Sequence, residues 1–185
     1  MANAGLTHGG FYAHFKSKDA LLRESLDYAG NETVAMLSKP LAEVPPEGRL
    51  GAVIDAYLSS AHAAHPERGC PVASLGPEVA RAGGATQRSL AKGIENRIAW
   101  MRQLLPESQR GFSEDQVIAT LACMIGGVIL ARSVTIKDSA VVLNACREFL
   151  HRAFEGSAEV ARAARTKTRR ARAAAPPENR ARGRR

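Results

Sequence analysis

The sequence predicts an all-α protein, and three observations support this prediction. Apolar residues make up 45% of the 185 residues but aromatic residues only 5%, and the frequent Ala and Leu lose little entropy in a helix. Apolar positions recur at spacings of three and four, with capping and helix-breaking residues between the repeats. No segment alternates between apolar and polar residues over the length of a half-buried strand.

The first long helix is expected to begin after Ser17. Ser17 is a favourable N-cap, and Asp19 places a carboxylate in the first turn, where it suits the helix dipole. Apolar residues continue to Leu37. Pro40 then stops the helix because proline cannot continue the backbone hydrogen bonds.

A second helix is expected from Pro46 to about Ala61, with one apolar stripe at spacings of three and four. It ends before Pro66, and the segment PERGCP that follows is predicted to be a loop because of its Pro and Gly content. A short helix over residues 72–82 is expected to be interrupted at Gly76 and Pro77.

Three more signals define the remaining helices. Residues 86–105 form a long predicted helix whose apolar face contains Leu90, Ile94, Ile98, Met101 and Leu105. Ser113 and Gln116 have the spacing of a capping box, and the helix after them is apolar almost all round. Asp138 or Ser139 is expected to cap a last helix that reaches Phe154.

The last two helices are predicted to be buried on more than one side. A helix that is apolar all round needs more than one covering surface, and one monomer core hides only one face of each helix. Dimerisation through residues 113–132 and 138–154 would supply the second surface. Gly126 and Gly127 either permit close helix approach across that dimer or merely lower helix stability.

Charge is concentrated at the C-terminal end. The formal net charge is +8, yet residues 1–157 hold 16 Lys and Arg against 16 Asp and Glu, and the remainder holds 10 against 2. Residues 157–185 are therefore predicted to form a basic, disordered tail. The tail is either a solvated extension or a source of sequence-independent affinity for phosphate.

Several classes of protein are disfavoured. Cys70, Cys123 and Cys146 are odd in number and widely spaced, so neither a disulfide framework nor a structural zinc site is expected. His62 and His65 could place two metal ligands on one helix, but no third ligand is identifiable. No catalytic motif or cofactor-binding motif is found, so we expect neither an enzyme nor a cofactor.

The location is predicted to be cytoplasmic. No uninterrupted apolar run reaches about 18 residues, so no membrane span is expected. The N-terminus lacks a basic region followed by an apolar region, so no signal peptide is expected either.

The segment NAGLTHGGFYAHFKSKDALL, residues 3–22, carries the most specific signal. It has the pattern of a turn, a short helix, a second turn and a second helix. Phe11 and Phe15 are four residues apart, so they share one face, while Tyr12 and His14 lie on others. A short helix with a buried Phe face and exposed polar side chains has the properties of a DNA-recognition helix.

This segment resembles the end of the helix-turn-helix in the tetracycline-repressor-like (TetR/AcrR) family of transcriptional regulators. The family pattern is roughly G-[VL]-[ST]-x-x-x-[FL]-Y-x-[HY]-F-x-[SN]-K-x-x-L. The matching positions are Gly5, Leu6, Thr7, Phe11, Tyr12, His14, Phe15, Ser17, Lys18 and Leu21.

The resemblance implies a role for each matching position of the head. Phe11 and Phe15 would hold the recognition helix, about residues 7–15, against the domain core. Lys18 would anchor a phosphate together with the amides at the start of its helix. The residues expected to contact DNA are Thr7, His8, Gly9, Gly10, Tyr12, His14 and Lys18. For Tyr12 and His14, ordinary surface packing is the alternative.

The resemblance also implies an organisation and a function. Residues 1–38 would be an incomplete helix-turn-helix head with its connecting helix, and residues 46–156 a helical domain that binds an effector and dimerises. The protein would be a ligand-responsive repressor that binds a double-stranded DNA operator. The alternative is a small-molecule-binding dimer without specific DNA binding. Candidate pocket residues are Tyr57, Leu75, Trp100 and Met124, each of which could instead be plain core.

The family pattern starts late in this chain. A complete head would carry two helices ahead of the recognition helix, or roughly 30 residues with their turns. Three explanations are left open by the sequence: a misassigned start, a true truncation, or a short head that works as it stands. The effector, the operator and the regulated genes are not revealed by the sequence.

Overall fold

The computed structural model describes residues 12–106 and 112–154. Every regular element in these ranges is a helix and none is a strand, so the all-α prediction is confirmed. The residues from 155 onward, which include the basic tail predicted for residues 157–185, lie outside the described residues.

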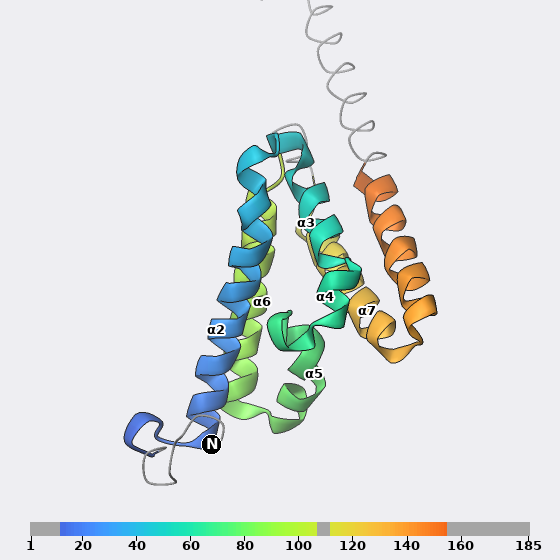
Figure 1. Cartoon of the computed structure of the whole chain (residues 1–185). Helices are drawn as coiled ribbons and strands as arrows, with labels where there is room; N and C mark the ends of the chain where they lie inside the picture. The colour runs from blue at the N-terminus through green and yellow to red at the C-terminus, as the bar shows by residue number, and fades with distance from the viewer. Residues whose placement is uncertain (1–11, 107–111, 155–185) are drawn as a thin grey trace, which may run out of the picture.

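Two long helices, α2 (Lys18–Ser38) and α6 (Gly84–Gln103), lie side by side and run in the same direction (Figure 1). α2 begins as expected, because the Oγ of Ser17 accepts a hydrogen bond from the backbone N–H of Ala20 at 3.1 Å. A 3-10 turn, η2 (Lys39–Glu43), contains Pro40 and ends the α-helical run. Most of the polypeptide between α2 and α6 runs in the opposite direction to these two helices and lies on one side of the pair (Figure 1).

The single helix expected from Pro46 to Ala61 is divided in the structure. A 3-10 turn, η3 (Pro46–Gly48), leads into α3 (Arg49–Tyr57), and a separate short helix, α4 (Ser60–Ala64), follows. The break occurs because Ser59 is extended and its Oγ accepts a hydrogen bond from the backbone N–H of His62 at 3.1 Å. A new N-cap thus starts within the apolar stripe, which the stripe alone could not reveal.

The helix after the PERGCP segment differs from the prediction in the opposite way. A 3-10 turn, η4 (Pro66–Arg68), precedes α5 (Pro71–Ala82), and α5 continues through Pro77 without interruption. Pro77 is exposed, and its missing N–H removes only the one helical hydrogen bond to the carbonyl group of Ala73. Two consecutive glycines with positive φ, Gly83 (+64°) and Gly84 (+58°), then turn the chain sharply into α6.

α7 (Glu114–Ser133) begins with the predicted capping box. The backbone N–H of Gln116 donates to Ser113 Oγ at 3.2 Å, and the backbone N–H of Ser113 donates to Gln116 Oε1 at 2.8 Å. In the part of the chain that the structure describes, α7 is the one helix whose length and apolar composition would allow it to cross a membrane. The core helix of a protein can have the same length and composition, and 39% of the most apolar 18-residue segment of α7 is buried within the protomer.

A last helical stretch, residues 136–154, packs beside α7 (Figure 1). Asp138 and Ser139 were the expected caps, but both lie inside the helix. Thr135 precedes the helix, and its carbonyl oxygen accepts from the N–H groups of Asp138 at 3.0 Å and Ser139 at 2.9 Å. The Oγ1 of Thr135 also donates to Asp138 Oδ2 at 2.6 Å, so the side chain of Asp138 is used by the residue that starts the helix.

The hydrophobic core lies where α2, α3, α4, α6, α7 and the last helical stretch meet. Gly127 lets α7 approach its neighbours, because a Cβ there would lie 2.9 Å from Cys146 Sγ and 3.0 Å from Leu58 Cδ2. The close approach at Gly127 is therefore within one protomer, whereas a Cβ on Gly126 would meet nothing within 4 Å. The largest fully buried apolar side chains are Leu37, Val53, Ile54, Tyr57, Leu58, Val79, Met101, Met124, Val128 and Leu143.

Candidate functional site

The residues expected to contact DNA fall partly within the structure. Thr7, His8, Gly9 and Gly10 lie outside the described residues. Tyr12 and His14 belong to one helical turn just before α2, and both are exposed. Lys18 is the first residue of α2 and is exposed too.

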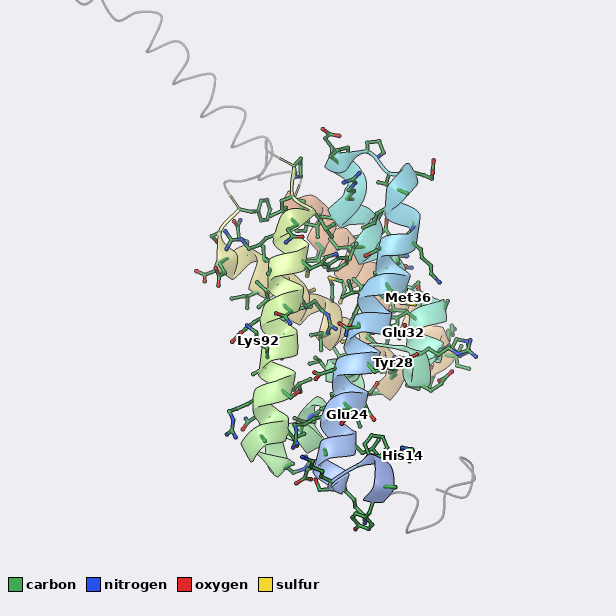
Figure 2. All side chains as sticks on the ribbon, turned by 90° about the vertical axis from the view of Figure 1, so that its left-hand side faces the viewer. His14, Glu24, Tyr28, Glu32, Met36 and Lys92 are labelled. Carbon is green, nitrogen blue, oxygen red and sulfur yellow. The ribbon has the colours of Figure 1, made fainter. Side chains whose placement is uncertain are left out.

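These three side chains therefore gather at the N-terminal end of α2. Figure 2 shows His14 at the base of this helix, far along its axis from Met36. Phe15 is half-buried at the same end.

A cavity of about 660 Å³ lies between α2, α5 and α6. Its walls are mostly α2 and α6, with Pro71 and Val72 at the start of α5. Gly30 on α2 and Gly93 on α6 both line it. A Cβ on Gly93 would meet nothing within 4 Å, whereas a Cβ on Gly30 would lie 3.3 Å from Arg97 Nη2. The lining residues are Leu26, Asp27, Gly30, Asn31, Val34, Ala35, Pro71, Val72, Ser89, Leu90, Lys92, Gly93, Asn96, Arg97 and Trp100.

The four predicted pocket residues are placed in different surroundings. Trp100 lines the cavity and is half-buried. Tyr57 and Met124 are each only 1% exposed and belong to the core, and Leu75 is exposed at the surface of α5. These three residues do not line the cavity.

Arg97 is the cavity residue that the sequence interpretation missed. It is only 6% exposed, and it lies on the apolar face of α6 between Ile94 and Met101. A signal was available, because positions 94, 97 and 101 follow the spacing of three and four that defines the stripe. A cation at such a position marks either a buried polar contact or a site.

A network of polar groups centred on His62 lies next to this cavity. The side chain of His62 is buried, its Nδ1 lies 2.6 Å from the carbonyl oxygen of Tyr57, and its Nε2 accepts from the backbone N–H of Cys70 at 3.3 Å. Because Nε2 must accept, the proton of the neutral ring lies on Nδ1, which donates to Tyr57. Burial lowers the pKa of His62, so the neutral ring is favoured.

Tyr57 and Thr33 complete the network. The rings of Tyr57 and His62 are 4.4 Å apart, and burial raises the pKa of Tyr57 far above its ordinary value. Thr33 on α2 donates from Oγ1 to the carbonyl oxygen of Ala29 at 2.7 Å and is 3.3 Å from that of Gly69. The network therefore connects α2 with the loop that precedes α5.

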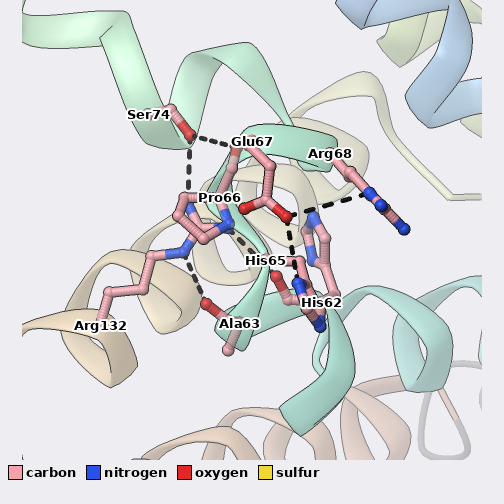
Figure 3. A network of polar contacts seen from close by, with 8 residues as sticks. All are labelled: His62, Ala63, His65, Pro66, Glu67, Arg68, Ser74 and Arg132. Carbon is pink, nitrogen blue, oxygen red and sulfur yellow. Dashed lines mark hydrogen bonds and ion pairs between the residues drawn. The ribbon is translucent and has the colours of Figure 1, made fainter.

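Arg132 on α7 binds the C-terminal end of α4 (Figure 3). Its Nε donates to the carbonyl oxygen of Ala63 at 3.0 Å, and its Nη2 donates to that of His62 at 3.2 Å. Its Nη1 donates to Ser74 Oγ at 3.3 Å. One cation thus donates to two carbonyl groups at the end of the short helix and also contacts α5. The carbonyl oxygen of His62 additionally accepts from the backbone N–H of His65 at 3.4 Å.

The outer part of the same region is exposed. Glu67 Oε1 lies 3.1 Å from His65 Nδ1 and 3.9 Å from Arg68 Nε, as Figure 3 shows. The hydrogen bond from its own backbone N–H, followed by the one to His65, lowers the pKa of Glu67. These solvent-exposed pairs contribute little to stability.

The described residues offer no metal centre. Across residues 12–106 and 112–154, no three His, Cys, Asp or Glu side chains are grouped so that they could hold a metal ion. Both ring nitrogens of His62 are engaged within the protein, so His62 and His65 do not form the two-ligand pair that their spacing allowed. All three cysteines are free thiols.

Comparison with known proteins adds no assignment to this geometry. No protein-family model matches the chain, and no curated protein matches it.

Proposed function

We propose that the protein is a ligand-responsive DNA-binding regulator that acts as a repressor. The observation that carries this proposal is the position of α2. Its middle part, from Leu26 to Ala35, forms one wall of the cavity, and its N-terminal end carries the exposed side chains of Tyr12, His14 and Lys18. One continuous helix therefore joins a space for a small molecule to the segment that resembles a TetR-family recognition helix.

The mechanism follows from linkage between the two ends of α2. A ligand in the cavity contacts α2 and α6 together, so it favours the relative position of these helices that fits it best. If that position differs from the one that suits DNA, ligand binding weakens DNA binding by the difference in ligand affinity between the two states. The repressor would then leave its operator when the effector is present.

A homodimer is part of this proposal, because a helix-turn-helix repressor reads two half-sites one helical turn apart. Large apolar side chains remain exposed along α7 and the last helical stretch, although one face of each helix is buried in the protomer. A second copy of the chain that packs on these helices would cover them. The exposed set is Ile118, Ile129, Leu130, Val134, Ile136, Val141 and Phe149.

DNA binding by the full chain tests the proposal. Labelled duplexes tiled across the DNA that flanks the protein's own gene are compared with a random duplex of equal length, by fluorescence anisotropy. We expect at least one tiled duplex to bind more tightly, with an affinity that falls steeply between about 50 and 200 mM salt. If every duplex binds like the random one, the proposed DNA-binding function is excluded.

Two lysines at opposite ends of α2 provide a matched pair of variants. Lys18→Ala removes a cation from the proposed DNA-contacting end, so binding should weaken on all sequences and the salt slope should fall by about 1. Lys39→Ala removes an exposed cation just beyond the other end of α2 and should leave both quantities unchanged.

The second candidate function is a small-molecule-binding dimer that does not recognise a DNA sequence. The observation that favours it is that the cavity and the exposed apolar side chains are formed by α2, α5, α6, α7 and residues 136–154, without the segment before α2. Ligand-stabilised melting in a protein that binds no tiled duplex would indicate this function.

A further inference from the structure

The cavity contains a buried cation without a counter-charge. Arg97 Nη1 donates to Cys70 Sγ at 3.3 Å, and Nη2 donates to the carbonyl oxygen of Gly30 at 3.2 Å. Neither acceptor is a carboxylate. The Nε of Arg97 is buried and has no hydrogen-bond partner within the described residues.

The charged groups around the cavity do not neutralise Arg97. Asp27 is exposed on α2, and its Oδ1 accepts from Ser89 Oγ at 3.1 Å. Lys92 also lines the cavity, but it is itself a cation, and its Nζ pairs with Glu95 Oε2 at 3.1 Å. Among the ion pairs of residues 12–106 and 112–154, none includes Arg97.

A buried charge that has no partner is costly, because it has left water without gaining an opposite charge. The cost is removed when an anion enters the cavity. A guanidinium has five N–H donors in a planar fork, and Arg97 uses two of them. Of the three that remain, the Nε–H is buried, and one N–H on each of Nη1 and Nη2 is left for a bidentate contact with a carboxylate.

The rest of the cavity wall is largely apolar. Leu26, Val34, Val72, Leu90 and the ring of Trp100 line it. Its volume of about 660 Å³ falls within the usual range of small-molecule sites, about 300–1,000 Å³. Such a wall favours a ligand with a hydrocarbon or aromatic body.

We propose that the cavity binds a small organic monoanion, with a carboxylate that pairs with Arg97 and an apolar or aromatic body that lies against Trp100. This inference rests on the proposed function, because it names the chemical class of the effector. The carboxylate would take the place of the missing counter-charge. The other two charged residues that line the cavity, Asp27 and Lys92, have opposite signs, so Arg97 accounts for the net charge of the cavity wall.

Thermal unfolding of the full chain with a panel of probes tests this inference without DNA. The probes are linear monocarboxylates from butyrate to decanoate, phenylacetate and naphthoate, each compared with its own primary amide at equal ionic strength. We expect at least one carboxylate to raise Tm in a saturable way while its amide does not. Equal shifts for acid and amide, or no saturable shift with any millimolar carboxylate, would overturn the inference.

Variants test the charge of Arg97 and the space in the cavity separately. Arg97→Met removes the charge and keeps the length of the side chain, so the affinity for the carboxylate should fall at least about tenfold. Gly93→Leu fills space in the cavity while keeping the charge of Arg97, and it should also abolish the shift. Ala91→Leu introduces the same side chain at an exposed position of α6 outside the cavity and should retain the shift.

The folding of each variant is checked by circular dichroism. If Arg97→Met does not fold, Gly93→Leu and Ala91→Leu still decide the matter, because retention of the shift in Gly93→Leu would place the anion elsewhere and overturn the inference. Failure here is distinct from failure of the proposed function. A carboxylate that binds while no tiled duplex does would exclude the regulator and keep the anion site.

Discussion

The backbone N–H of Cys70 donates a hydrogen bond to Nε2 of His62 over 3.3 Å, and both residues are buried. This contact requires a neutral imidazole at Nε2, since a protonated ring would present a second donor to the N–H group. Protonation of His62 therefore breaks the contact as well as placing a charge in the interior.

The first prediction concerns pH and stability. Burial lowers the pKa of His62 in the folded state relative to about 6.5 in the unfolded chain. The stabilisation that His62 provides is thus complete above pH 6.5 and is lost as the pH falls through the folded-state pKa, because the unfolded chain takes up the proton first. Urea unfolding should show a loss of at most about 1.4 kcal/mol per pH unit from this one proton.

His62→Gln should lose this part of the pH dependence, and His65→Gln, which alters an exposed side chain, should keep it. An unchanged slope below pH 6.5 in His62→Gln would show that other groups are responsible.

The second prediction concerns Arg132. Arg132→Met removes the side-chain donor from the carbonyl oxygens of Ala63 and His62, of which only that of His62 keeps a backbone contact, the N–H of His65. We therefore expect a loss of about 1–3 kcal/mol in the free energy of unfolding. Arg102→Met is the control, because Arg102 is exposed and pairs with Glu114 at 3.0 Å. That surface pair should contribute less than about 1 kcal/mol. Equal losses in the two variants would refute the role of Arg132 as a clamp on α4.

The third prediction separates two adjacent glycines. Gly126→Ala should stabilise the protein by about 1 kcal/mol, because a helix-interior glycine is replaced by a better helix former and the new Cβ meets open space. Gly127→Ala should destabilise it by about 1–3 kcal/mol, because its Cβ would overlap Cys146 and Leu58. Thermal and urea unfolding measure both effects, and a stabilised Gly127→Ala would contradict the packing around α7.

The fourth prediction concerns oligomeric state. Phe149→Glu places a charge on the apolar face proposed to pair two copies, so light scattering after size-exclusion chromatography should give the monomer mass of 19.8 kDa. The unaltered chain should give twice that mass. Tyr28→Glu changes an equally exposed aromatic residue on α2 and should remain dimeric. A monomeric unaltered chain would exclude the dimer.

Elements defined by local chemistry were predicted well. The capping box of Ser113 and Gln116 needs only four residues of sequence, and so does the N-cap at Ser17. Ser59 and Thr135 were missed because several Ser, Thr and Asp residues compete for the same role, and the surrounding packing selects one. Pro77 was predicted to interrupt α5, but one lost hydrogen bond on an exposed face is tolerated.

The cavity could not be predicted in the same way. It depends on the distance between α2 and α6, and on Gly30 and Gly93, which are far apart in the sequence. Trp100 was selected as an apolar residue on a central helix, whereas Arg97 was overlooked although it interrupts an apolar stripe. A charged residue on such a stripe is a candidate for a ligand-binding residue.

Because α2 is long, a small rotation of this helix moves its N-terminal end by a large distance. At 1.5 Å per residue, Lys18 lies about 18 Å along the axis from Gly30, where the helix borders the cavity. A rotation of only about 5° about that point would carry Lys18 by about 1.6 Å. In a two-fold dimer the second copy of α2 would move in the opposite direction. The distance between the two proposed DNA-contacting ends would then change by up to about 3 Å, whereas the groove repeat of DNA is fixed at about 34 Å.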